Sequence, residues 1–157
     1  MIEPMIEPIF VILGILASVA IPRLAATRED AEISAAVANL RTLVSDASAY
    51  LAVQGNFNGA RWNAITNVPL VNTNATPTAY LKVGGKGCIG VRLANKAAGG
   101  NAPAYIHFTK VTGNSVNGSV CPQVQAAAPV KAYLDSTVAS VQGVTGAIAI
   151  GSSTKIY

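Results

Sequence analysis

Two cysteines and one histidine are the residues of this chain with the most varied chemistry. Cys88, Cys121 and His107 are its only thiols and its only imidazole. A protein zinc site needs about four ligands at short spacings, so these widely spaced residues do not predict a metal site. The cysteines are expected either to form a disulfide, if the domain is exported, or to remain two buried thiols. We predict no metal and no cofactor.

No arrangement typical of catalysis accompanies His107. The histidine lies in "AYIHFTKVT", residues 104–112, whose alternation of apolar and polar residues predicts a strand. Nucleophilic or acid–base catalysis would need a serine or cysteine nucleophile beside a base, or a pair of acids, and no recognisable motif of either kind is present. We therefore predict that the protein is not an enzyme.

The charged residues are distributed unevenly along the chain. Up to Gln54 six acids face three arginines, whereas after it eight lysines and arginines face only Asp135. The second part is therefore basic, and it could attract DNA, anionic lipid or other acidic surfaces. The alternative is that these scattered cations form a solvated surface that keeps the protein soluble.

The stretch "IFVILGILASVAIPRL", residues 9–24, is the most apolar part of the chain. Ile9 to Ile21 contains no charge, yet a helix of this length spans roughly 20 Å. A bilayer core needs about 30 Å. The preceding "MIEPMIEP" is an acidic tandem repeat, unlike the basic start of a secretory signal. Neither a standard signal peptide nor a standard transmembrane anchor is predicted.

An amphipathic helix is predicted after Pro22. Apolar residues recur at steps of three and four, at Ile33, Val37, Leu40, Val44, Ala47 and Leu51. The helix should end at "QGNFNG", where Gly55 favours a left-handed C-cap. Either the chain breaks between Pro22 and Thr27, with Thr27 as the cap, or Pro22 only kinks one long helix that starts near Ile9.

Short strands are predicted beyond Gly55, at 79–83, 88–93, 104–112 and 147–150. Residues 65–78 are interpreted as a surface connection, and 130–141 fits a strand or a helix. The predicted fold class is α+β: a long N-terminal α-helix whose C-terminal half packs on an antiparallel β-sheet. We divide the chain into an apolar helix half (1–22), an amphipathic helix half (23–54) and a globular β-sheet domain (55–157).

The segment "GILASVAIPRLAATRE" resembles the N-terminal helix of type IV pilins and their relatives in the type IV filament superfamily. The resemblance rests on a glycine, an Ala-rich aliphatic run, Ile21-Pro22-Arg23 and a charged helix, and it covers residues 9–54. It implies that the apolar half lies in the bacterial inner membrane before assembly, and then packs against copies of itself in the core of a helical filament.

The resemblance also implies which residues take part in subunit assembly. In the family a glutamate near the N-terminus neutralises the terminal amine of a neighbouring subunit. Met5 stands at that place here, so Glu7 is the first candidate for the role and Glu3 the second. Charged residues after Pro22 would set the register between neighbours. The other assembly residues are Ile9, Phe10, Val11, Ile12, Leu13, Gly14, Ile15, Leu16, Val19, Ile21, Pro22, Arg23, Arg28, Glu29 and Asp30.

By the same resemblance, Cys88 and Cys121 correspond to the disulfide-bounded region near the C-terminus of many major pilins. The implied function is a structural subunit of a surface pilus for adhesion, motility or DNA uptake. The implied partners are further copies, a prepilin peptidase, the inner-membrane assembly machinery, and possible targets such as DNA or anionic surfaces. Two alternatives are a pseudopilin of a type II secretion system and a membrane-anchored basic binding module.

Overall fold

The computed structural model describes residues 6–73, 78–95, 103–113, 120–139, 141 and 143–151. The chain divides into two compact units, Met1–Ala31 and Glu32–Tyr157. Helix α1, Ile6–Gln54, supplies the described part of the first unit and begins the second. Each unit therefore has to be explained by its own burial and its own contacts.

Helix α1 follows the second of the two predicted alternatives, because it continues through Pro22. Thr27 does not cap a new helix: its hydroxyl donates to the carbonyl of Arg23 at 2.8 Å, one turn back in the same helix. The predicted C-terminus is confirmed. The helix ends at Gln54, and Gly55, with φ 75°, donates its N–H to the carbonyl of Leu51 at 2.8 Å.

The part of α1 that belongs to the second unit buries one stripe of its surface. Ala36, Leu40, Leu43 and Ala47 are at most 2% exposed, and their spacing of four, three and four residues keeps them on one face. The predicted apolar face is rotated slightly from the buried one. Four of its residues are only partly buried, at the edges of the stripe: Ile33, Val37, Val44 and Leu51. The two leucines at the centre of this stripe are fully buried, and an alanine lies at each end of it.

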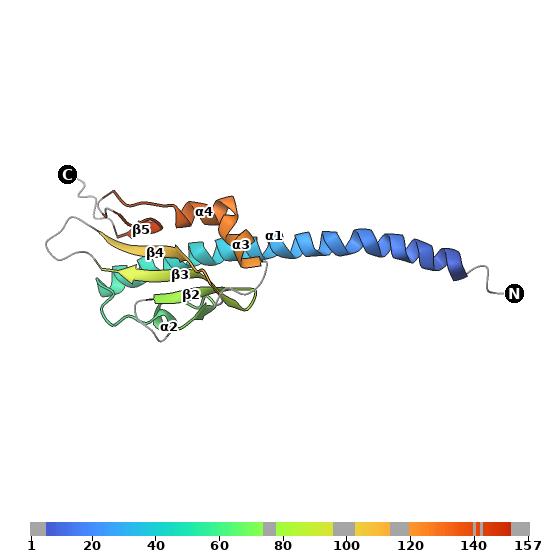
Figure 1. Ribbon diagram of the computed structural model, residues 1–157. Helices are drawn as coiled ribbons and strands as arrows, with labels where there is room; N and C mark the ends of the chain where they lie inside the picture. The colour runs from blue at the N-terminus through green and yellow to red at the C-terminus, as the bar shows by residue number, and fades with distance from the viewer. Residues whose placement is uncertain are drawn as a thin grey trace. The chain divides into compact units, whose positions relative to one another are not determined.

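Five strands form one antiparallel sheet in the order β1-β2-β3-β4-β5, so every strand pairs with its neighbour in sequence (Figure 1). The strands are β1 Leu70–Val71, β2 Thr78–Val83, β3 Lys86–Ala94, β4 Ala104–Lys110 and β5 Ala147–Ile150. The four predicted strands are therefore confirmed, with small changes at their ends. The two-stranded pairing of β1 with β2 was not predicted, because residues 65–78 were interpreted as a surface connection.

Alternate residues of the three central strands form the core with α1. The sheet side of this core consists of Ala79, Leu81, Val83, Ile89, Val91, Leu93, Ala104, Ile106 and Phe108, all buried. They share one hydrophobic cluster with Leu40 and Leu43 of the helix. The fold is thus α+β, with the later part of the long helix packed on an antiparallel sheet, as predicted.

Three short helices complete the described part of the second unit: α2 Trp62–Ile65, α3 Val120–Ala126 and α4 Ala128–Leu134. The segment 130–141, which fitted either a strand or a helix, begins as a helix, because α4 extends to Leu134. The last two helices bury Cys121, Val124, Val130 and Leu134 against the sheet core. The sequence analysis had included α4 as one of two alternatives, whereas it had not predicted α2 or α3.

Candidate functional site

The apolar segment of α1, Ile9–Ile21, is a helix without a polar face. Its large residues are all between 55% and 68% exposed: Ile9, Phe10, Val11, Ile12, Leu13, Ile15, Leu16, Val19 and Ile21. These residues follow one another so closely that they cover every side of the helix. A helix that is apolar all round is normally buried in a large core, an assembly or a membrane.

The described residues include one helix that is long and apolar enough to cross a membrane, and this helix is α1. None of its most apolar window is buried. Such a segment near an N-terminus is typical of a membrane anchor or of a signal sequence.

The backbone of this segment is intact but has two weak points. At Gly14 no other heavy atom would lie within 4 Å of an added Cβ, so the glycine isn't required for close packing inside this chain. Pro22 lies inside the helix and has no N–H to give to the carbonyl one turn earlier. Ser18, the residue whose carbonyl loses this donor, turns its hydroxyl to the carbonyl of Ile15 at 2.8 Å.

The charged residues predicted to take part in assembly lie on α1 and point to solvent to different degrees. Arg23, Arg28 and Asp30 are exposed, and Glu29 is half-buried. Among the described residues the ion pair within 4 Å joins Lys131 of α4 to Asp135, the residue that follows this helix, so none of these four charges is neutralised within the described part of the chain.

The two glutamates predicted to neutralise a terminal amine differ in what can be said of them. Glu7 lies exposed in the first turn of α1, where a carboxylate interacts favourably with the helix dipole. Glu3 lies outside the described residues. Which of them has the predicted role stays a prediction.

The disulfide between Cys88 and Cys121 is present, with 5.7 Å between the Cα atoms. It decides the question that the cysteine pattern left open, since both sulfurs are bonded and no free cysteine remains. Cys88 lies on β3 and Cys121 in the first turn of α3, so the bond ties this helix to the sheet.

The local backbone explains why Cys88 can reach α3. Leu81 of β2 pairs with Ile89, but the next residue, Lys82, pairs with Gly87. Cys88 is therefore the extra residue of a β-bulge, a feature that locally changes the direction of a side chain. Gly87 and Gly90 on either side of it are both close to neighbouring side chains, as an added Cβ would lie 2.9 Å from the Cβ of Tyr80 and 2.3 Å from the Oγ1 of Thr109.

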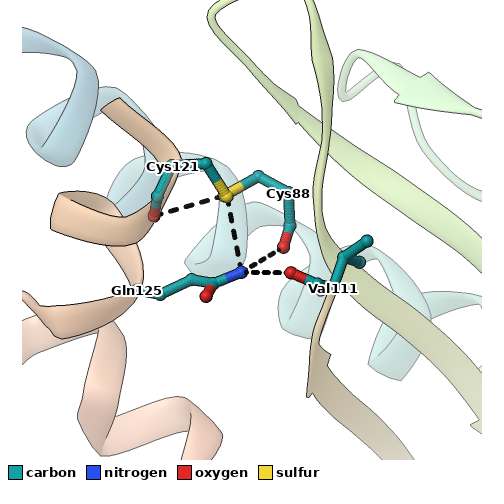
Figure 2. The surroundings of a disulfide bond; sticks show 4 residues. All are labelled: Cys88, Val111, Cys121 and Gln125. Carbon is teal, nitrogen blue, oxygen red and sulfur yellow. Dashed lines mark hydrogen bonds between the residues drawn. A yellow bond between two sulfur atoms is a disulfide. The ribbon is translucent and has the colours of Figure 1, made fainter. Parts of the chain in front are cut away.

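Gln125 is the polar partner of the disulfide, and the sequence analysis missed it. Figure 2 shows its side-chain nitrogen between three acceptors. Nε2 donates to the carbonyl of Cys88 at 2.7 Å and to that of Val111 at 3.1 Å, and lies 3.4 Å from the sulfur of Cys121. Because Gln125 and Cys121 are one helical turn apart, the same face of α3 carries the disulfide and the amide. That spacing was the available signal.

His107 takes part in the structure of the sheet. His107 lies on β4, and its Nε2 is 2.8 Å from the carbonyl of Thr145, two residues before β5. This contact makes Nε2 the protonated nitrogen, since a carbonyl can only accept. The described ranges contain no group of three or more histidine, cysteine, aspartate or glutamate side chains placed to hold a metal ion.

The aromatic residues of the second unit are used for packing. Trp62 is 1% exposed, Phe57 is buried, and the rings of Tyr50 and Phe57 stack with centroids 6.1 Å apart. Phe10, by contrast, belongs to the exposed apolar segment.

No protein-family model, curated protein or solved structure matches this chain.

Proposed function

We propose that this chain is a structural subunit that assembles with copies of itself into a helical filament of the type IV pilus kind. The observation that carries the proposal is the apolar segment Ile9–Ile21, which is exposed on all sides of its helix. The resemblance of residues 9–54 to type IV pilins supports the same conclusion. So does the α+β fold of the second unit, with its disulfide.

Burial of this segment supplies the driving force for assembly. Each square ångström of apolar surface removed from water contributes about 25 cal/mol, so a segment of this size contributes on the order of tens of kcal/mol before costs. Most of this gain is offset by the lost freedom of the subunits and by ordering at the interface. Before assembly the segment lies in the inner membrane. After assembly the neighbouring helices replace the lipid.

Charge pairing between copies then sets how the subunits are aligned. Arg23 and Arg28 lack a partner within the described part of the chain, as do Glu29 and Asp30. A neighbouring copy offers the opposite charges on the same stretch of helix. Glu7 pairs with the terminal amine of a neighbour, because a carboxylate inside a filament is tolerated only when it is paired.

Aspartate substitutions in the segment test the proposal. Val11→Asp and Ile15→Asp each place a charge on an apolar surface that assembly must bury. Fibres seen by negative-stain electron microscopy should therefore disappear. The second unit should stay folded, as judged by circular dichroism and an intact disulfide. The matched control is Val53→Asp, because Val53 is an 81% exposed apolar residue of the same helix outside the segment.

Normal fibres from both segment variants would contradict assembly through this surface. A different result would favour the second candidate function. If the native chain is found in the membrane fraction and never in fibres, the apolar helix is an anchor for a basic binding module or for a pseudopilin of a secretion system. An anchor of either kind is supported by α1, which is long and apolar enough to span a membrane.

A further inference from the structure

The two sulfurs of the disulfide lie in different polar surroundings. The Sγ of Cys121 lies 3.4 Å from the Nε2 of Gln125, which is a hydrogen-bond donor. The Sγ of Cys88 lies 3.6 Å from the backbone carbonyl oxygen of Cys121, which can only accept. Figure 2 draws both contacts as dashed lines. Both cysteines are buried, so water does not even out this difference.

The difference matters before the bond exists, when the chain carries two thiols. A thiolate accepts hydrogen bonds, whereas a thiol can donate one weakly through its S–H. The amide donor beside Cys121 therefore favours the thiolate at that position, and the carbonyl beside Cys88 favours the protonated thiol. The thiolate is the form that attacks a disulfide. The reduced chain thus has one sulfur prepared to react and one kept protonated.

The amide of Gln125 is held in place without the sulfurs. Its Nε2 donates to the carbonyl of Cys88 at 2.7 Å and to that of Val111 at 3.1 Å. Gln125 also follows Cys121 by one turn of α3, so this contact lies within one helix. A charged sulfur competes well for the two hydrogens, because hydrogen bonds to an ion are stronger than those to a neutral carbonyl. The donor therefore stays beside Cys121 when the bond is absent.

The charges around the pair do not reverse this preference. Helix α3 has no charged residue of its own. The titratable side chains of the elements around it are Lys86 and Arg92 on β3, Tyr105, His107 and Lys110 on β4, and Lys131 and Tyr133 on α4, with Asp135 after α4 paired to Lys131. All the cations among them are exposed, so water and salt screen their effect on the buried sulfurs. Hydrogen bonding then distinguishes one sulfur from the other.

We infer that Cys121 is the reactive thiol of the pair, and the site at which the chain forms a mixed disulfide with a thiol–disulfide oxidant. Its thiolate attacks one sulfur of the oxidant's disulfide and releases the other as a thiolate. Cys88 then gives up its proton, attacks the sulfur of Cys121 and releases the second oxidant thiolate. The chain loses two electrons and two protons, and the oxidant's disulfide becomes two thiols. Filament assembly is not required, because these residues all belong to the second unit.

Competitive alkylation of the two thiols is the direct test. The full chain in detergent micelles is reduced, freed of reductant without oxygen, and treated with limiting iodoacetamide over a range of pH. Peptide mass mapping gives a rate for each cysteine. Cys121 should reach half its maximal rate at a lower pH than Cys88. At neutral pH it should react about threefold faster or more, because a tenfold larger thiolate fraction is partly offset by lower nucleophilicity.

The same titration in urea is the control, because both thiols should then reach half their maximal rates at the same pH. Equal values in native buffer, or a lower value for Cys88, would overturn the assignment. Gln125→Leu should move the value for Cys121 to higher pH, whereas Gln123→Leu, on an exposed residue of the same helix, should leave it unchanged. A looser α3 alone would change the rate equally at every pH, so it would not imitate this shift.

A matched pair of variants tests the mixed disulfide itself. Cys88→Ser and Cys121→Ser each retain one thiol and lack the second thiol that would release the oxidant. Each is diluted from urea into oxidised glutathione and quenched with acid at intervals, so that the adduct forms while the unit folds. This measurement needs no stable reduced state. The glutathione adduct should form faster on Cys88→Ser, which keeps Cys121. An equal or faster rate on Cys121→Ser would overturn the inference.

Discussion

At the scale of single residues, Gln125 shows how one amide can hold three segments together. It joins α3, in which it lies, to β3 through the carbonyl of Cys88 and to the end of β4 through the carbonyl of Val111. The carbonyl of Cys88 also accepts the N–H of Val111 at 3.2 Å, so it keeps a partner without the glutamine. The carbonyl of Val111 has only the Gln125 amide as a donor among the contacts described above, so it would lose its hydrogen bond if the glutamine were replaced.

Gln125→Leu should therefore destabilise the second unit by about 1–3 kcal/mol, the usual cost of leaving partly buried polar groups without a hydrogen bond. Reduction of the disulfide by dithiothreitol should also become faster, because α3 is held less firmly beside β3. Urea denaturation and thiol release measure the two effects. Gln123→Leu is the control, as Gln123 is exposed on the same helix. Equal effects of the two variants would contradict this role for Gln125.

At the scale of the elements, β5 depends on a single glycine at its start. Gly146 has φ 83°, its carbonyl accepts the N–H of Phe108 at 2.7 Å, and its N–H donates to the carbonyl of Ser136 at 2.6 Å. An added Cβ would lie 2.0 Å from the carbonyl oxygen of Phe108. The approach of this turn to β4 is thus possible only without a side chain.

Gly146→Ala should cost clearly more than the ~1–2 kcal/mol of placing a side chain in the left-handed region, since a backbone clash is added. Gly143→Ala is a close control, because Gly143 has a similar φ of 80° but would have no atom within 4 Å of its new Cβ. Thermal unfolding of the two variants separates the cost of the clash from the cost of φ. Equal melting temperatures would show that β5 does not approach β4 as described.

The elements also show what sequence patterns can predict. Strands β2 to β5 were predictable because each alternates or is continuously apolar between turn residues. The C-terminus of α1 was predictable from Gly55. Helix α3 was not, because it is short, carries Pro122 in its first turn, and depends on burial of Cys121 and Val124 against the sheet.

The candidate site was predictable to a different extent. The apolar segment was evident because its thirteen residues carry no charge, and the disulfide was one of two stated alternatives. The Gln125 contacts could not be predicted, because they depend on the bulge at Cys88 and on a strand register that only tertiary packing determines.

At the scale of the whole molecule, the disulfide is the covalent link that closes the second half of the folded unit. It joins positions 33 residues apart, so it restricts the unfolded chain between β3 and α3. On the chain-entropy estimate a loop of this size contributes about 3–4 kcal/mol to stability. For a domain of ordinary marginal stability this is a large share of the total.

Replacing both cysteines, Cys88→Ser with Cys121→Ser, should lower the free energy of unfolding by about that amount, ~3–4 kcal/mol. Reduction of the native chain should give a similar loss, whereas the double variant should no longer respond to reductant. Guanidinium titrations with and without dithiothreitol measure all four states. Unchanged stability of the double variant would mean that contacts such as those of Gln125 hold α3 without the bond.

The order of the strands has a consequence for how fast the chain folds. Strands β2, β3 and β4 follow one another closely and each pairs with the one before it, whereas β5 joins β4 only after the residues from 111 to 146. Folding rates rise as the contacts of a protein become more local. The β2–β3 hairpin, with its tight glycine turn, is suited to form first. β4 can then add from the next segment of the chain, whereas β5 has to wait until α3 and α4, which lie between it and β4 in the sequence, have been synthesised.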